Sequence, residues 1–465
     1  MDVCEEYVSM PASPMAECFN SSVLNVFVLG VLESEIPIDD SKAVPLLEHL
    51  LLPINTRFSS IMVKDNKGKK HWKQVDVNVK EHIKIPTFPT NTPLKLYDEY
   101  LKDYMTKIST EELPQDKPLW EMHMIIYPTS SAAGTFIFKL HHSLGDGYSL
   151  MTTLLSCVQR ADDPSVPITF PSSRRSLVES KINIKTMLRG LPSSASLVKN
   201  AVDFWWNALK GSLIANDGQT TIRSGHEDVG FRPIDISNVS VSLESIKQVK
   251  NLLKVSVNDA LVGIIFLGIR LYMEAMNHES SNANTTALVL LNTRKIRAYK
   301  SVKDMLAKNS EAPWGNRFHF MHIPIPELSD TNKLNPLEFV LEANKIIETK
   351  RYSLAVPLTD MILGLVNKIK GPEAAAKNVQ KMLNNSSLSI SHMVGPVEKV
   401  AWTNHPIKGF YFMTVGLSQS LTVTITSYMG YLRLGFGVEK GFIDEHKFNT
   451  CFKTALEMML NAART

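Results

Sequence analysis

The sequence predicts a mixed α/β protein built from two halves of similar size. Segments rich in β-branched residues alternate with segments of helical spacing along the 465 residues. The chain is 44% hydrophobic and 21% charged, as expected of a globular protein with a large core. Between Arg174 and Ile214 seven basic residues face two acidic ones, alongside Gly190 and Pro192. We therefore expect halves at residues 1–170 and 226–465, joined by a basic amphipathic linker at 171–225.

The first half opens with a β-branched run that predicts a buried strand. A stretch of helical spacing follows, and two strand-like segments flank a loop with Asn and Gly at its tip, which is typical of a hairpin. Large apolar residues then alternate in a strand that leads directly into a helical pattern. The expected elements are a strand at 23–29, a helix at 43–52, hairpin strands at 58–63 and 72–79, a strand at 135–140 and a helix at 148–158.

The second half repeats this alternation of strands and helices without any fixed period. Its helices show apolar residues three and four apart, and its strands are short and rich in Val, Ile, Leu and Thr. The expected strands lie at 239–243, 287–291, 388–392, 409–415 and 421–428, and the expected helices at 243–253, 257–273, 337–350 and 444–461.

Composition excludes several classes of function. The net charge of +4 is too small to indicate a nucleic-acid partner. The four cysteines form no CxxC pair, which argues for a reducing compartment and against a thiolate metal site. The acidic N-terminus is not that of a signal peptide, and the longest uncharged apolar run, at 260–269, is about half of the ~20 residues that a membrane span needs.

Residues 141–147, His-His-Ser-Leu-Gly-Asp-Gly, form the strongest candidate site. They lie at a strand–turn–helix junction, where α/β folds place ligands. The strand's period of two puts His142 on the face of Phe136, Phe138 and Leu140, and an imidazole with a pKa near ~6.5 suits general-base catalysis. Neither G-x-S-x-G, a P-loop nor HExxH is present. The pattern therefore favours direct transfer between two bound substrates; the alternative is a buried histidine pair with Asp146 as a helix cap.

Several short motifs, in order along the chain, resemble those of one enzyme family. HHSLGDG matches the HHxxxDG motif of CoA-dependent acyltransferases and is preceded by Pro118-Leu119-Trp120. Asn258-Asp259, Asn292-Thr293-Arg294, WGNRF at 314–318 and SHMVGP at 391–396 follow. Together with PASPM at 11–15, they resemble the plant wax ester synthase/acyl-CoA:diacylglycerol acyltransferase family over nearly the whole chain.

The resemblance implies a fold, a reaction and a set of site residues. The fold would be two chloramphenicol-acetyltransferase-like halves with a substrate tunnel between them. The reaction would be O-acyl transfer from a fatty acyl-CoA to a long-chain alcohol or to diacylglycerol, with His142 as general base, His141 in support and no acyl-enzyme. Acyl-CoA is then a substrate rather than a cofactor, and the resemblance implies that neither a metal nor a redox cofactor is needed. The residues expected to contact substrate are Gly147, Pro118, Leu119, Trp120, Asp259, Gly395 and Pro396.

Three further residues carry specific expectations. We expect Asp146 to be structural and to pair with Arg294, or only to cap the following helix, worth about 1 kcal/mol. Asn258 either donates to the developing oxyanion or caps the helix that follows it. His392 stands where plant members usually carry Asn, and the change is either silent or alters substrate preference.

The alternatives to this function are a carrier-protein-dependent condensation-type acyltransferase and an inactive lipid-binding homologue. We also expect the protein to bind a membrane surface through the linker. There an apolar stripe containing Phe204, Trp205 and Trp206 lies between Lys199 and Lys210, which is typical of an interfacial helix; the alternative is a helix that packs across the two halves. The expected location is the cytosolic face of the endoplasmic reticulum membrane, with the plasma membrane as the second choice.

Overall fold

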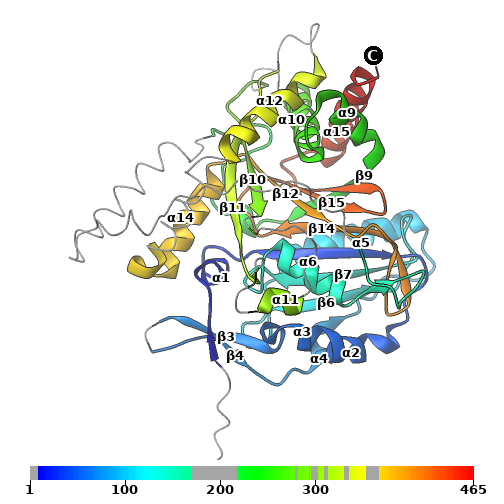
Figure 1. Ribbon diagram of the computed structural model, residues 1–465, viewed down its shortest axis with the longest axis vertical. Coiled ribbons are helices and arrows are strands. Elements are labelled where there is room, and N and C mark those ends of the chain that lie inside the picture. The colour runs from blue at the N-terminus through cyan, green and yellow to red at the C-terminus, as the bar shows by residue number, and fades with distance from the viewer. Residues whose placement is uncertain are drawn as a thin grey trace, which may run out of the picture.

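Two mixed β-sheets, one above the other in Figure 1, organise the fold. The computed structural model describes residues 9–66, 68–169, 217–277, 281–292, 294, 302–307, 310, 313–328, 335–351 and 366–464. The lower sheet is built mainly from the first part of the chain, and the upper sheet from the second part (Figure 1). The predicted α/β class with two halves is therefore confirmed.

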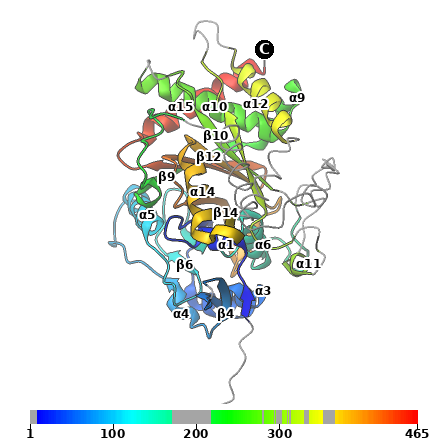
Figure 2. The same ribbon diagram turned by 90° about the vertical axis from the view of Figure 1, so that its left-hand side faces the viewer.

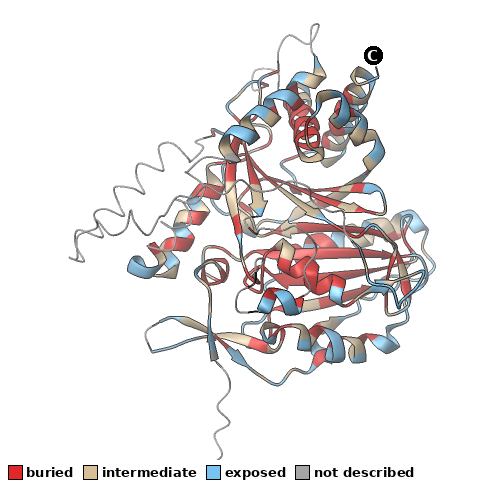
Figure 3. Ribbon diagram, viewed as in Figure 1, coloured by how far each residue is buried: buried red, intermediate tan, exposed pale blue. Residues whose placement is uncertain are grey.

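The lower sheet runs in the order β5-β6-β7-β2-β14-β13-β8. Its central strands β2 and β7 are buried at every residue, because helices cover both faces (Figure 3). Phe138 packs in one cluster with Leu150 of α6, and Ile137 packs on the opposite face with Met105 of α5. The bounds are β2 (Phe27–Ser34), β5 (Ile83–Lys84), α5 (Leu94–Thr110), β6 (Trp120–Ile125), β7 (Gly134–His141), α6 (Gly147–Ser156), β8 (Gln159–Arg160), β13 (Val400–Trp402) and β14 (His405–Val415).

The upper sheet runs in the order β11-β10-β12-β15-β16-β9, with β10, β12 and β15 parallel. Helices α9, α10, α12 and α15 cover its outer face, and α10 is buried almost throughout, as the red helix in Figure 3 shows. Ser256 begins α10 with a capping box to Asp259. The bounds are β9 (Ile234–Ser242), α9 (Leu243–Leu253), α10 (Val257–Met276), β10 (Thr286–Asn292), β11 (Phe318–Pro324), α12 (Pro336–Arg351), β12 (Leu388–Val394), β15 (Leu421–Tyr428), β16 (Tyr431–Glu439) and α15 (Glu445–Ala462).

The expected boundary between the halves needs a correction. Strand β14 lies in the second half of the sequence, yet it pairs antiparallel with β2 in the lower sheet, with Phe412 opposite Gly30. Its other face packs against β15 of the upper sheet, where Thr424 Oγ1 donates to Phe412 O. An ion pair between Arg433 of β16 and Glu33 of β2, at 2.7 Å, also joins the two sheets. The halves are therefore interleaved rather than separated at residue 225.

The predicted linker at 171–225 is also corrected at its end. Asp217 to Gly225 pack on the second half: the carboxylate of Asp217 accepts hydrogen bonds from Thr286 N and Ser387 Oγ, at 2.7 and 2.6 Å. The amphipathic stretch with Phe204, Trp205 and Trp206 lies outside the described residues.

Smaller elements complete the layers. A short sheet, β1 (Ser9–Pro11), β4 (Lys70–Gln74) and β3 (Ser60–Lys64), contains the predicted hairpin. Helix α1 (Pro14–Phe19) contacts α14 (Pro372–Asn384), as the side view in Figure 2 also shows. Within the described ranges, no single helix has the length and hydropathy of a membrane span; α9 and α10 meet the criterion only as a pair bent by 100°.

Candidate active site

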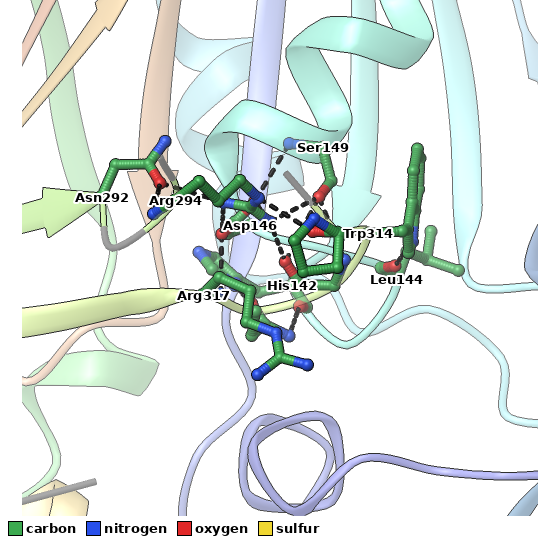
Figure 4. A network of polar contacts seen from close by, with 11 residues as sticks. His142, Leu144, Asp146, Ser149, Asn292, Arg294, Trp314 and Arg317 are labelled. Carbon is green, nitrogen blue, oxygen red and sulfur yellow. Dashed lines mark hydrogen bonds and ion pairs between the residues drawn. The ribbon is translucent and has the colours of Figure 1, made fainter. Parts of the chain in front are cut away.

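Residues 141–147 form the turn between β7 and α6, as the sequence predicts. His141 ends the strand, and Asp146 caps the helix because its Oδ1 accepts a hydrogen bond from Ser149 N at 3.0 Å. The backbone N–H of His142 donates to Val26 O of the chain leading into β2, at 2.8 Å. The turn faces residues 313–317, the segment that leads into β11 of the upper sheet (Figure 4).

His142 and Asn316 form a reciprocal pair. Asn316 Nδ2 donates to the backbone oxygen of His142 at 3.0 Å, and Asn316 Oδ1 lies 3.0 Å from His142 Nδ1. Because the first contact assigns Nδ2 as the donor, Oδ1 must accept, and Nδ1 of the imidazole therefore carries the proton. The Nε2 atom is left with a free lone pair. It forms no hydrogen bond with a described residue and is not fully buried.

The surroundings of His142 keep the ring neutral. The rings of Phe19 and Phe318 lie 4.5 and 5.7 Å from it between centroids. Burial lowers the pKa of His142 below its ordinary value, and this effect outweighs the opposing charge of Asp146 and the hydrogen bond to Asn316. A neutral imidazole with a bare Nε2 is the form that a general base requires.

His141 has both ring nitrogens occupied. Ser143 N–H donates to its Nδ1 at 3.1 Å, so the proton sits on Nε2, which donates to Asn25 Oδ1 at 2.9 Å. Its side chain is fully buried, and burial lowers the pKa of His141 to about 3. These contacts hold the turn in place and leave no nitrogen for substrate, which fits the supporting role expected for this residue.

Asp146 contacts Arg294, the partner predicted for it, in a bidentate ion pair. Arg294 Nη1 lies 2.7 Å from Asp146 Oδ2 and Nη2 lies 3.1 Å from Oδ1 (Figure 4). Both side chains are buried, with 1% of Arg294 and 6% of Asp146 exposed. Asp146 also caps α6 by accepting the hydrogen bond from Ser149 N, so the two roles considered for it, ion pair and helix cap, occur together.

Arg294 also anchors the segment that carries Asn316. Its guanidinium donates to Pro313 O at 2.9 Å and to Gly315 O at 2.5 Å. Trp314 Nε1 donates to Leu144 O at 2.9 Å, from the other side of the same turn. The carboxylate of Asp146 accepts a further bond from Arg317 N at 2.8 Å. The network in Figure 4 thus fixes the turn of the lower sheet against the strand entry of the upper sheet.

Asn258 does not cap its helix, which corrects one of the two expectations. Ser256 is the cap of α10, and Asn258 lies inside the first turn. Its Oδ1 lies 2.6 Å from Nδ1 of His392, whose pKa burial lowers to about 4. The neutral ring therefore donates from Nδ1, and its buried Nε2 has no hydrogen-bond partner in the part of the chain that the structure describes. Asn258 thus holds His392, the unusual histidine of the SHMVGP motif, through its Oδ1 atom. The Nδ2 donor of Asn258 takes no part in this contact.

The structure gives Asp259 and the Pro118-Leu119-Trp120 triplet structural contacts, and their expected contact with substrate stays a prediction. Asp259 Oδ2 accepts from Ser256 N and from Asn344 Nδ2, at 2.9 and 3.0 Å, as part of the α10 cap. Pro118, Leu119 and Trp120 are buried in the lower half. The Trp120 indole donates to a backbone oxygen, that of Phe58, at 2.8 Å.

Gly147 and Gly395 are explained by close approach. A Cβ on Gly147 would lie 2.7 Å from the sulfur of Met393, and one on Gly395 would lie 2.3 Å from Ser427 O. Glycine therefore allows α6 to approach β12, and allows the chain before Pro396 to approach β15. That these three residues also contact substrate stays a prediction.

Sequence reasoning gave no role to Asn316, nor to Phe19. Asn316 belongs to the WGNRF motif and adjoins Arg317, so the motif itself was the available signal. Phe19 carries no signal of its own, because its contact with His142 depends on how α1 returns to the turn. Among the described residues, no group of three or more His, Cys, Asp or Glu side chains could hold a metal ion.

Comparisons with known proteins identify the family of the chain. The wax ester synthase/diacylglycerol acyltransferase catalytic domain matches residues 54–261, and the WS/DGAT C-terminal domain matches residues 314–460. Wax ester synthase/diacylglycerol acyltransferase 11 of Arabidopsis thaliana is 29% identical over 97% of this chain and 94% of its own length. Wax ester synthase/diacylglycerol acyltransferase 4 of the same plant is 27% identical over 95% of this chain and 88% of its own length.

Solved structures support the fold. A wax ester synthase/diacylglycerol acyltransferase from Marinobacter aquaeolei has a TM-score of 0.59 at 16% identity and covers 98% of this chain and all of its own. A trichothecene 15-O-acetyltransferase from Fusarium sporotrichioides has a TM-score of 0.61 at 11% identity, covering 99% and 96%. Both domain models match in order along the chain, and the catalytic one includes the HHxxxDG turn. The chain therefore belongs to the wax ester synthase/diacylglycerol acyltransferase family.

Proposed function

We propose that this protein transfers a fatty acyl group from acyl-CoA to the hydroxyl of a long-chain alcohol or of diacylglycerol. Family membership supports the reaction class. The observation that carries the mechanism is the free Nε2 of His142, which Asn316 leaves unprotonated by fixing the proton on Nδ1. Neither an acyl-enzyme nor a metal is required by this geometry.

The proposed step is a direct attack. His142 Nε2 takes the proton of the acceptor hydroxyl while that oxygen bonds to the thioester carbonyl carbon. The tetrahedral intermediate then collapses, the carbon–sulfur bond breaks, and the imidazolium returns its proton to the departing sulfur of CoA. The products are an ester and CoA. Asn258 is the proposed donor to the oxyanion, since its Nδ2 is not engaged by His392.

The test is a product assay with purified protein. Radiolabelled acyl-CoA is supplied with hexadecanol, with diacylglycerol, or with no acceptor, and in a parallel arm the acyl group is supplied on a carrier protein. Ester formation from acyl-CoA, lost in His142→Ala and retained in His49→Ala, an exposed histidine, supports the proposal. Transfer only from the carrier protein favours the condensation-type alternative. Lipid binding without any ester product favours the inactive homologue.

We further propose that the protein works on the cytosolic face of the endoplasmic reticulum membrane, where both acceptors reside. The support is the sequence pattern of the linker: apolar and aromatic residues around Trp205 flanked by Lys199 and Lys210. Flotation with liposomes tests it. A folded Phe204/Trp205/Trp206→Ser variant should float less than the wild type, and equal flotation would reject this segment as the anchor.

A further inference from the structure

A polar cavity of about 400 Å³ lies outside the network around His142. Its walls are helix α14, the loop between β14 and β15, and the chain at 223–227. A volume of this size is within the range of small-molecule binding sites. The side chains that carry the argument are Arg223, His226, Glu227, Lys377, Lys381 and Ser418.

The cavity gathers cations without carboxylate partners. Lys377 and Lys381 are one helical turn apart on the exposed face of α14, whose opposite face is buried at Ala376 and Val379. Neither lysine forms an ion pair with a described residue. Like charges four residues apart on a helix repel each other weakly, and an anion bound between them would relieve this repulsion.

Arg223 adds a positioned third charge. Its Nε and Nη2 donate to Asn384 O at the end of α14, at 3.2 and 2.6 Å, which holds the guanidinium beside the lysines. It too lacks a carboxylate partner among the described residues. Glu227 is the one acidic side chain on the wall, against Arg223, Lys377 and Lys381, so the cavity carries excess positive charge.

The cavity lies close to the catalytic turn. Leu417 precedes Ser418 of the cavity wall in the chain, and it packs against the cluster of Phe19, Val26 and Phe318. Phe19 and Phe318 are the two rings that contact His142. A chain of contacts through Leu417 and these two rings therefore connects the cavity wall with the proposed base. The contact of α1 with α14, seen in Figures 1 and 2, belongs to the same region.

We propose that this cavity binds the phosphoadenosine diphosphate end of acyl-CoA, which rests on the proposed acyl-CoA substrate. That group carries negatively charged phosphates at its 3′ and 5′ positions, and the positive charges of Lys377, Lys381 and Arg223 would attract them. In this proposal the pantetheine arm runs from the cavity along the region of Leu417 toward His142. The positive charge of the cavity would thus recognise the CoA part of the acyl donor, and the apolar side chains around His142 would contact its acyl chain.

Direct binding to the free protein tests this proposal without using catalysis. Calorimetry measures the affinities of CoA, dephospho-CoA, 3′,5′-ADP and inorganic phosphate for four proteins. These are the wild type, Lys377→Ala/Lys381→Ala, the charge-preserving Lys377→Arg/Lys381→Arg, and Lys453→Ala, which removes an exposed lysine of α15. The double alanine variant should bind CoA about ten-fold more weakly and lose the preference for CoA over dephospho-CoA. The arginine variant and Lys453→Ala should bind as the wild type does.

The outcomes distinguish a failure of the cavity assignment from a failure of the proposed acyltransferase function. Unchanged affinity for CoA in the folded double alanine variant overturns the cavity assignment, whatever the enzyme transfers. Equal affinity of the wild type for inorganic phosphate and CoA also overturns it, because it would mean a site for free phosphate. Lysine-dependent binding of CoA and 3′,5′-ADP supports the assignment, even if no ester forms and the proposed function fails.

Discussion

His142 and Asn316 hold each other by two hydrogen bonds across the junction of the two halves. Asn316 Nδ2 donates to the His142 backbone oxygen, and its Oδ1 accepts from Nδ1 of the ring, each at 3.0 Å. The histidine comes from the turn after β7, and the asparagine from the chain that enters β11. One half of the protein therefore supplies the proposed base, and the other fixes which of its nitrogens is free.

Replacing His142 with alanine should remove the base and leave the fold intact. We expect kcat to fall by about 10²–10⁴-fold, since general-base catalysis typically contributes that much. Ester formation and thermal unfolding are measured side by side. A folded variant that turns over at close to the wild-type rate would refute the assignment.

Replacing Asn316 tests whether it positions the imidazole. In Asn316→Ala the Nδ1 proton loses its acceptor, and we expect kcat to fall about ten-fold by loss of the correct tautomer. Asn316→Asp retains an acceptor but adds a negative charge, which raises the pKa of His142. The acid limb of the rate–pH profile should then move to higher pH in Asn316→Asp. A profile identical to the wild type would leave Asn316 with only a packing role.

Breaking the ion pair of Asp146 and Arg294 on one side should destabilise the protein strongly. Loss of one partner leaves the other charge buried, at a cost of about 3–5 kcal/mol in the free energy of unfolding. We expect Arg294→Met to show this loss in denaturant unfolding. Lys399→Ala, which breaks the half-exposed pair with Glu35 at 2.6 Å, is the matched control and should cost about 0–1 kcal/mol. Equal losses in the two variants would contradict the prediction.

The buried histidines predict a loss of stability in acid. Burial lowers the pKa of His141 to about 3 and that of His392 to about 4, whereas both take their ordinary value near 6.5 on unfolding. Below pH 6.5 the unfolded chain thus binds more protons than the native protein. The unfolding free energy should fall by about 1.4 kcal/mol per pH unit for each such histidine, down to about pH 4. Denaturant titrations between pH 7 and 4 measure how steeply the unfolding free energy falls with pH. Replacing His392 with Asn should remove the contribution of one histidine, about 1.4 kcal/mol per pH unit.

The local patterns predicted most strands and helices well. The predicted bounds of α9 and β15 agree with the structure, and those of β7, α10 and α15 differ by a few residues at most. These elements have strong apolar periodicity and clear ends. Helix α5 was not predicted, because its buried residues, among them Tyr97 and Met105, are diluted by polar neighbours. Strand β16 was not predicted either, since its glycines, Gly435 and Gly437, obscure the alternation of apolar and polar residues.

The site was predictable where short motifs contained its residues. The turn at 141–147 has all of its members within seven residues. The pairing of Asp146 with Arg294 was expected as a hypothesis, because both residues lie in motifs at strand ends. The contacts of Asn316 and Phe19 with His142 join segments far apart in the chain, and no local periodicity encodes such distances. The correction at Asn258 arose because Ser256, two residues earlier, takes the cap.

The route of β14 has a consequence for synthesis on the ribosome. Strand β2 needs β14 as its neighbour, yet β7 is complete at His141 and β14 only at Val415. At about 5–20 residues per second, the buried strand β2 must wait roughly 15–55 s with one edge unpaired. An open apolar edge is a template for aggregation, so chaperones have a defined interval in which to act on the nascent chain. A fragment ending before β14 would never close that edge.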